Sequence, residues 1–132
     1  MSYHEAAQKV FYDSLVNNSE LMQIANDVYD FVDGKKEYPY ITIGESSSLE
    51  WDTFYDVGRS LVLTVHCWSD SRGAKEVQQM QGFIYSALHR ARLDHEGYNF
   101  VLCDSDSDDF FRDEGGLIWH GVQTFRVIIE EI

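Results

Sequence analysis

Apolar and polar positions near the start of the chain follow the period of a helix. Between residues 6 and 15, small and apolar side chains recur every three or four positions, which is typical of a helix with one buried face. The spacing of Ser2 and Glu5 matches a capping box, in which each side chain satisfies a backbone N–H at the helix start. The pattern predicts a helix that ends at Asn17-Asn18 and a second short helix from Ser19.

Further along, several segments have the composition or the period of β-strands. The clearest is 59–69, where apolar groups occupy both alternating faces, so that a central place in a sheet is expected. The aromatic and branched residues of the other segments favour strands as well. The predicted strands are 28–32, 40–43, 59–69, 98–103 and 117–129, and we expect the last two to pair antiparallel across an acidic stretch and Gly115-Gly116.

One long helix is predicted between these strands, within residues 73–93. An N-cap is available at Asp70 or Ser71, and Arg90 and Arg92 would complement the helix dipole at its other end. Its buried stripe is predicted to consist of Val77, Met80, Ile84, Leu88 and Ala91.

The order of the elements predicts an α+β fold in a single domain spanning residues 1–132. We expect N-terminal helices within 3–26, then a mixed or mostly antiparallel sheet of about four to five strands with the long helix across one face, within 28–132. Residues 44–58 are rich in Ser and Asp and are interpreted as a loop or arm. Its aromatic residues Trp51, Phe54 and Tyr55 either contact neighbouring subunits or fold back over the core.

Composition and charge exclude several classes of protein. Hydrophobic residues make up 44% of the chain, which is incompatible with a disordered protein. Ten basic residues against 23 acidic ones give a net charge of −13, which repels the phosphate backbone of nucleic acids. The apolar runs are too short to cross a bilayer, so no membrane is expected as a partner. Cys67 and Cys103 lie in apolar segments and are predicted to be buried free thiols.

The search for site chemistry points away from an enzyme. Asp104, Asp106 and Asp108 alternate as in a calcium loop, but the required glycine and closing glutamate are missing, so a solvated acidic loop is expected. His66 and His120 could face one another on strands, and we interpret them as half-buried sheet residues. No nucleophile elbow or phosphate-binding glycine motif occurs. We therefore predict no catalytic residues, no metal site and no cofactor.

An ordered set of short stretches resembles a known family over nearly the whole chain. In this order and spacing, the set is similar to the tail-completion proteins of long-tailed phages and of gene-transfer particles, which include tail-terminator and head-to-tail joining subunits. The stretches are Val28–Asp30, Tyr38–Glu45, Leu63–Ser69, Gly73–Leu93 and Gly121–Val127.

The resemblance implies a non-enzymatic virion protein at the head-tail junction, assembled in the host cytoplasm. Such a subunit would form a ring, expected to be a hexamer, that caps the tail tube and contacts the tail tube protein and a head-completion or connector protein. DNA would pass through the ring without specific binding. The recurring positions would be structural, with Trp68 packing on the long helix or on a neighbour; they are Pro39, Tyr40, Gly44, Trp68 and Gly73.

Two alternatives come from other classes of protein. The net charge also fits a small acidic inhibitor that mimics DNA and occupies the groove of a host DNA-binding protein. A hydrolase that uses Asp or His, with His66 and His120 as the residues to test, is the third hypothesis.

Overall fold

The fold consists of one mixed sheet with helices on one side of it. The computed structural model describes residues 2–30, 32, 34, 36–52 and 57–132. Its elements are α1 (Tyr3–Val16), α2 (Ser19–Met22), β1 (Val28–Tyr29), β2 (Tyr40–Glu50), β3 (Gly58–Ser69), α3 (Lys75–Leu88), β4 (Asp94–His95), β5 (Tyr98–Arg112) and β6 (Trp119–Glu131).

The six strands lie in the order β1-β2-β3-β6-β5-β4, and β3 is central as predicted. The β1–β2 pair is parallel and the other pairs are antiparallel, including the predicted pair of β5 and β6. This arrangement confirms the α+β class, with six strands in the sheet where about four to five were expected.

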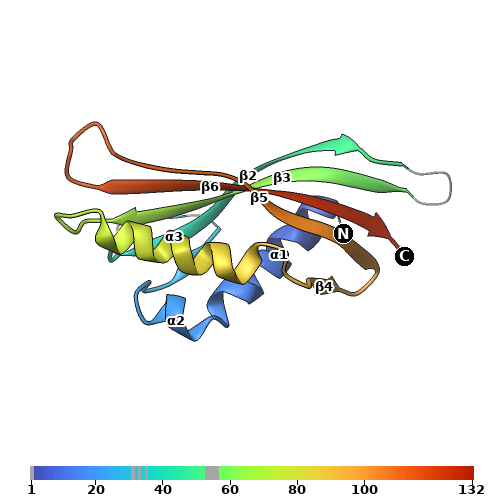
Figure 1. The fold of residues 1–132 in the computed structure, drawn as a ribbon, viewed down its shortest axis with the longest axis horizontal. Helices are drawn as coiled ribbons and strands as arrows, with labels where there is room; N and C mark the ends of the chain where they lie inside the picture. Colours follow the sequence, from blue (N-terminus) through green and yellow to red (C-terminus); the bar gives the residue numbers. More distant parts are fainter. Residues whose placement is uncertain (1, 31, 33, 35, 53–56) are drawn as a thin grey trace.

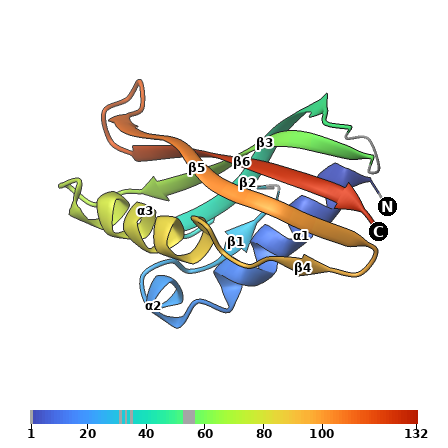
Figure 2. The same cartoon turned by 45° about the vertical axis from the view of Figure 1, so that its right-hand side comes forward.

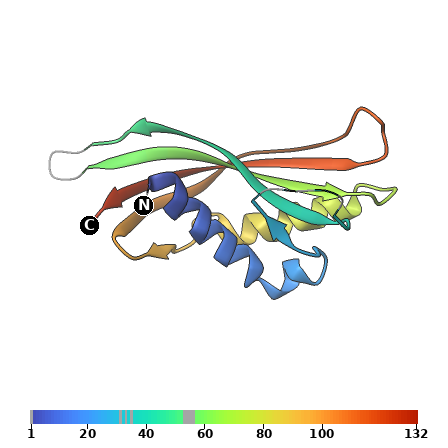
Figure 3. The ribbon, with the colours of Figure 1, turned by 180° about the vertical axis from the view of Figure 1, so that it is seen from behind.

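The helices cover only one face of the sheet, and the opposite face is open (Figures 1 and 3). Figure 2 shows α1 and α3 lying beneath the strands, with α2 beside the end of α1. The β2–β3 hairpin and the β5–β6 hairpin extend toward opposite ends of the molecule (Figure 1). The open face and the two hairpins are therefore the parts of the sheet that the helices leave available.

The first helix begins and ends where its sequence predicts. The Ser2 hydroxyl oxygen accepts a hydrogen bond from the Glu5 backbone N–H at 3.1 Å, which satisfies one of the unpaired donors of the first turn. Asn17 is the C-cap. On the buried face of α1, the ring of Phe11 meets that of Phe125 on β6 edge to face, with the ring centroids 5.7 Å apart. This contact joins the N-terminal helix to the centre of the sheet.

The core lies between the sheet and the helices. In β3, Leu61, Leu63, Val65 and Cys67 alternate inward and are buried, as period-two strand geometry requires. The predicted stripe of α3 is buried against them at Val77, Met80, Ile84 and Leu88. Both cysteine thiols are free and buried, which confirms the prediction for Cys67 and Cys103.

The long helix is shorter than predicted at both ends. It begins at Lys75, because the buried Ser69 hydroxyl donates to the Glu76 carboxylate at 2.7 Å and accepts from the Ser71 N–H at 3.2 Å, which holds the preceding turn outside the helix. It ends at Leu88, so Arg90 lies beyond it, with a φ of 56°. The Arg90 N–H instead donates to the Cys103 carbonyl oxygen at 2.7 Å, which directs the chain toward β5.

Two segments predicted as loops are strands. The predicted arm 44–58 is a strand up to Glu50, since β2 continues past a register shift at Gly44/Ser46 and pairs with β3 as far as Arg59. The acidic stretch 104–109 lies within β5, which pairs with β6 up to Arg112. Aspartate disfavours strands locally, but here the paired neighbour β6 supplies the ladder and the carboxylates remain at the surface.

Groups from α3 and its C-terminal turn reach the outer edge of β5. The Gln81 amide nitrogen donates to the Asp109 carbonyl oxygen at 2.8 Å, and the Ser105 N–H donates to His89 Nδ1 at 3.0 Å. Gly121 makes the first contact possible, because a Cβ at that position would lie 2.6 Å from the Gln81 nitrogen. This edge of the sheet is therefore partly satisfied from within the chain.

Candidate assembly surfaces

Four rings form a row across the open face of the sheet, called here the aromatic row: Tyr40 on β2, Trp68 on β3, His120 on β6 and Phe111 on β5. The register places each of them directly opposite the next on neighbouring strands. Their centroids are separated by 6.3 Å for Tyr40–Trp68, 3.8 Å for Trp68–His120 and 5.1 Å for His120–Phe111. Cross-strand aromatic pairs of this kind stabilise a sheet. Tyr40 is buried within the row, whereas Phe111 at its other end is exposed.

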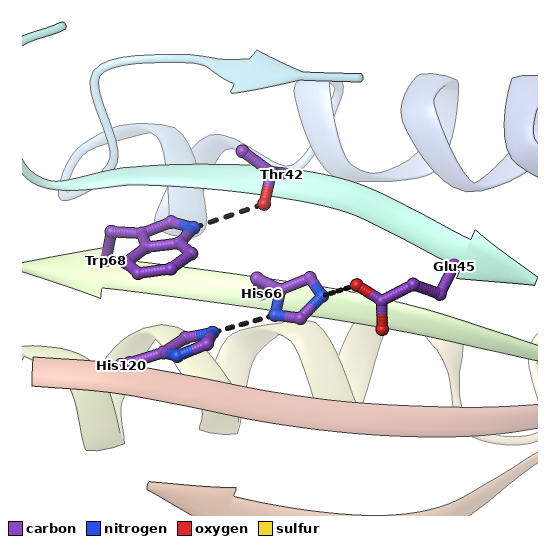
Figure 4. Close-up of polar contacts among 5 residues, drawn as sticks. All are labelled: Thr42, Glu45, His66, Trp68 and His120. Atoms are coloured by element: carbon purple, nitrogen blue, oxygen red, sulfur yellow. Dashed lines mark hydrogen bonds and ion pairs between the residues drawn. The ribbon is translucent and has the colours of Figure 1, made fainter. Parts of the chain in front are cut away.

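His66 and His120 do face one another, as the sequence predicts. His66 Nδ1 lies 2.8 Å from His120 Nε2, and His66 Nε2 lies 3.2 Å from a carboxylate oxygen of Glu45 (Figure 4). One tautomer pair satisfies both contacts, with His66 donating from Nε2 to Glu45 and His120 donating from Nε2 to His66. The same figure shows Trp68 Nε1 donating to the Thr42 hydroxyl, at 3.1 Å.

The environment of this pair fits a structural role. Burial, followed by the neighbouring His66, lowers the pKa of His120, while the carboxylates of Glu45 and Asp113 act in the opposite direction. A histidine held neutral in this way can accept or donate hydrogen bonds without adding charge to the sheet. Among the residues that the structure describes, no group of three or more His, Cys, Asp or Glu side chains could hold a metal ion.

Exposed apolar side chains also mark the two hairpins. Leu49 and Val57 flank the turn of the β2–β3 hairpin and are 74% and 60% exposed, and Leu117 in the β5–β6 turn is 78% exposed. Because the hairpins lie at opposite ends of the molecule (Figure 1), these apolar surfaces are far from one another within one chain. Each is suited to burial against a different surface of another molecule.

The predicted interface residues have different environments. Trp51 is half-buried, and its backbone N–H donates to the Gly58 carbonyl oxygen at 3.1 Å. Its ring covers Gly58, where a Cβ would lie 3.2 Å from Trp51 Cε3. Phe54 and Tyr55 lie outside the described residues. The role of these three residues in subunit contacts stays a prediction.

The positions that carried the family resemblance lie mainly on or near the open face. Tyr40 and Trp68 belong to the aromatic row, and Gly44 lies beside the ring of His66. Gly73 precedes α3, and Pro39 follows a cis peptide bond before β2. The prediction that Trp68 packs on the long helix is wrong, because its side chain points to the open face. The alternative, that Trp68 packs on a neighbouring molecule, stays a prediction.

Sequence reasoning missed three contributors to this surface: Thr42, Glu45 and Phe111. Their contacts depend on strand register, which brings Glu45 to a residue 21 positions away in the chain. The alternation of β3 was the one available signal, since it placed Thr64, His66 and Trp68 on a common face.

Comparisons with known proteins agree with one another. The family model described as tail completion protein gp17 matches residues 9–130. The tail completion protein gp17 of Bacillus phage SPP1 is 28% identical over 124 residues, covering 94% of this chain and 92% of that protein. The solved structure of bacteriophage SPP1 gp17 has a TM-score of 0.64 at 25% identity and covers 97% of this chain and 89% of that one.

A second solved structure has the same fold with closer geometric agreement. It is a chain in the virion of a native gene transfer agent particle, with a TM-score of 0.89 at 20% identity, covering 98% of this chain and 99% of that one.

Proposed function

Because the chain belongs to the tail completion protein gp17 family, a family of structural phage tail proteins, we propose that it forms a ring, a hexamer, that caps the tail tube and joins it to the head. Family membership confirms a virion protein that is not an enzyme, so the hydrolase hypothesis for His66 and His120 is wrong. The ring, its subunit number and its contacts with the tail tube protein and the head connector are the proposed part.

The observation that carries the ring is the position of the exposed apolar side chains at opposite ends of the molecule. Leu49 and Val57 lie at one hairpin, and Leu117 lies at the other. A contact between unlike ends of identical subunits is head to tail, and such contacts close into a ring when the rotation between subunits permits it. An interface between the same patches would instead produce a closed dimer.

The charge of the chain is compatible with a ring through which DNA passes. A net charge of −13 repels the phosphate backbone, so DNA would move past the wall without being held. The acidic residues are spread over α1, β2, β5 and the β5–β6 turn, and Arg90 lies 3.8 Å from Asp104. This spread does not favour the alternative of an acidic inhibitor that mimics DNA.

Two charge-introducing variants test the head-to-tail contact. Leu49→Asp should disable one end of the subunit and Leu117→Asp the other, so each variant alone should remain monomeric in light scattering coupled to size exclusion. In a mixture of the two variants, the intact end of one can bind only the intact end of the other, so assembly should stop at dimers. Tyr12→Asp, on the exposed side of α1, is the matched control and should form complete rings.

The same measurement is made with purified tail tubes, since the ring could close only on the tube. Wild-type protein should bind to tube ends alone. A wild-type chain that remains monomeric both alone and with tubes would contradict the proposal, as would rings formed equally well by all three variants.

A further inference from the structure

A recess of about 380 Å³ opens on the free face of the sheet beside the aromatic row. Gly44 forms part of its lining, with Thr42 next to it and the rings of Tyr40, Trp68 and His66 around it. A Cβ at Gly44 would lie 3.7 Å from the His66 ring, which is an ordinary van der Waals contact. The absence of a side chain at Gly44 therefore leaves space over β2. Neither a positive φ nor a steric clash requires glycine at this position.

Two carboxylates give this recess a negative rim. Glu45 is 78% exposed at its side chain although one oxygen accepts from His66, and Asp30, which follows directly after β1, is also exposed. Within the described part of the chain, the lining contains His66 and His120 but no Lys or Arg side chain. Aromatic walls with an acidic rim favour a cation that is flat and weakly hydrated, because such a group stacks on rings and pairs with carboxylates at the same time.

We infer that the recess binds an arginine side chain presented by another protein of the virion. The open face of a second copy is a poor source of the cation, since the approach of two open faces brings the exposed carboxylates of Glu45 and Asp30 on each copy together. A guanidinium in the recess would lie against Trp68 or Tyr40 and donate to Glu45. The inference rests on the proposed function only for the source of the arginine.

Binding is tested first with a small probe and no assembly. The peptide acetyl-Gly-Arg-Gly-amide is titrated into the protein while side-chain NMR signals of Trp68 and His66 are followed. The control peptide carries citrulline, which has the same shape without the charge. We expect saturable shifts with arginine only; equal shifts with citrulline, or shifts that do not saturate, would overturn the inference.

Two variants separate the cavity from the charge. Gly44→Val fills the recess while every charge is retained, and it should abolish the saturable shifts. Glu45→Gln should weaken binding by about two- to five-fold, as expected for an exposed ion pair. Glu50→Gln removes an exposed carboxylate from the same strand outside the recess and should bind like the wild type. Thermal unfolding of each variant verifies that it is folded.

Assembly then identifies the source of the arginine. Gly44→Val rings that form normally but no longer attach to purified tail tubes or heads would support a different virion protein. Loss of the rings themselves would make a second copy the occupant, and unchanged attachment to both tubes and heads would exclude a role in the virion; either result overturns the assignment. A wild-type chain that binds the peptide but never forms rings would contradict the proposed function alone.

Discussion

The imidazole of His120 lies parallel to the indole of Trp68, with the ring centroids 3.8 Å apart and the planes inclined by 11°. At its Nε2 edge the imidazole approaches His66, whose Nδ1 is 2.8 Å from His120 Nε2. Protonation of His120 would thus place a positive charge in a partly buried position next to a second histidine, and this is the physical cause of its lowered pKa.

Stability should consequently depend on pH through His120. A histidine with a lower pKa in the folded state binds fewer protons when folded than when unfolded. The free energy of unfolding is therefore undiminished by His120 above the unfolded pKa of about 6.5, and decreases as the pH falls from there toward the folded pKa. Urea denaturation over this range should show the decrease, and His120→Gln should reduce its slope. An unchanged slope in the variant would show that His120 does not cause the pH dependence of stability.

The two cysteines should be unreactive while the protein is folded. Burial raises the pKa of Cys103 to about 12 and also raises that of Cys67, so the nucleophilic thiolate is scarce at neutral pH. Iodoacetamide should label neither thiol in native protein and both in denaturant, as followed by mass spectrometry. Labelling of either thiol at the rate of a free peptide thiol in native protein would show that the position is accessible.

Two glycines of the fold should respond in opposite ways to alanine. At Gly121 the added Cβ would lie 2.6 Å from the Gln81 nitrogen and 3.0 Å from Val77, so Gly121→Ala should lower the free energy of unfolding by about 1–3 kcal/mol. Gly82 lies in α3 with open space at its Cβ position, and Gly82→Ala should raise stability by up to about 1 kcal/mol. Urea denaturation of both variants measures the two changes in the free energy of unfolding. Equal effects of the two substitutions would contradict the close contact between position 121 and Gln81.

The contact between Phe11 and Phe125 should be a major contribution to stability. Both rings are fully buried, and Phe11→Ala removes one of them from a packed core, which typically costs about 3–5 kcal/mol. Tyr12→Ala, at the next and exposed position of α1, should change the free energy of unfolding by less than about 0.5 kcal/mol. A small effect at Phe11 would mean that α1 is only loosely docked on the sheet.

Trp51→Ala tests the predicted interface without a change of charge. We expect the variant to remain folded and to lose ring assembly, because Trp51 is only half-buried and lies at the end of the β2–β3 hairpin. Circular dichroism and light scattering measure the two properties separately. Loss of folding would instead place Trp51 in the core, through its packing over Gly58.

Much of the fold could be predicted from the sequence, because burial imposes a regular spacing on the apolar residues of helices and strands. The inward residues of β3 and the stripe Val77, Met80, Ile84 and Leu88 were recognisable in this way. The acidic half of β5 was not, because the tendency of aspartate toward loops is overridden by pairing with β6. The parallel β1–β2 pair and the two-residue strand β4 are too short to leave a pattern.

The candidate surface was less accessible to prediction. His66 and His120 were identified because both have strand-like surroundings, but their partner Glu45 lies beyond Gly44, in a segment that was interpreted as a loop. The aromatic row and the recess depend on the register between four strands. A register is decided by the whole packed sheet and has no local signature in the sequence.

The hydrogen bonds of Gln81, His89 and Arg90 to β5 affect how easily this strand could pair with another chain before assembly. An exposed strand edge is a template for uncontrolled lateral pairing, and it can nucleate fibrils in a crowded cell. Here groups from α3 and the turn that follows it already bond to backbone groups of Cys103, Ser105 and Asp109. These bonds leave fewer free backbone groups on β5 with which the strand of another chain could pair.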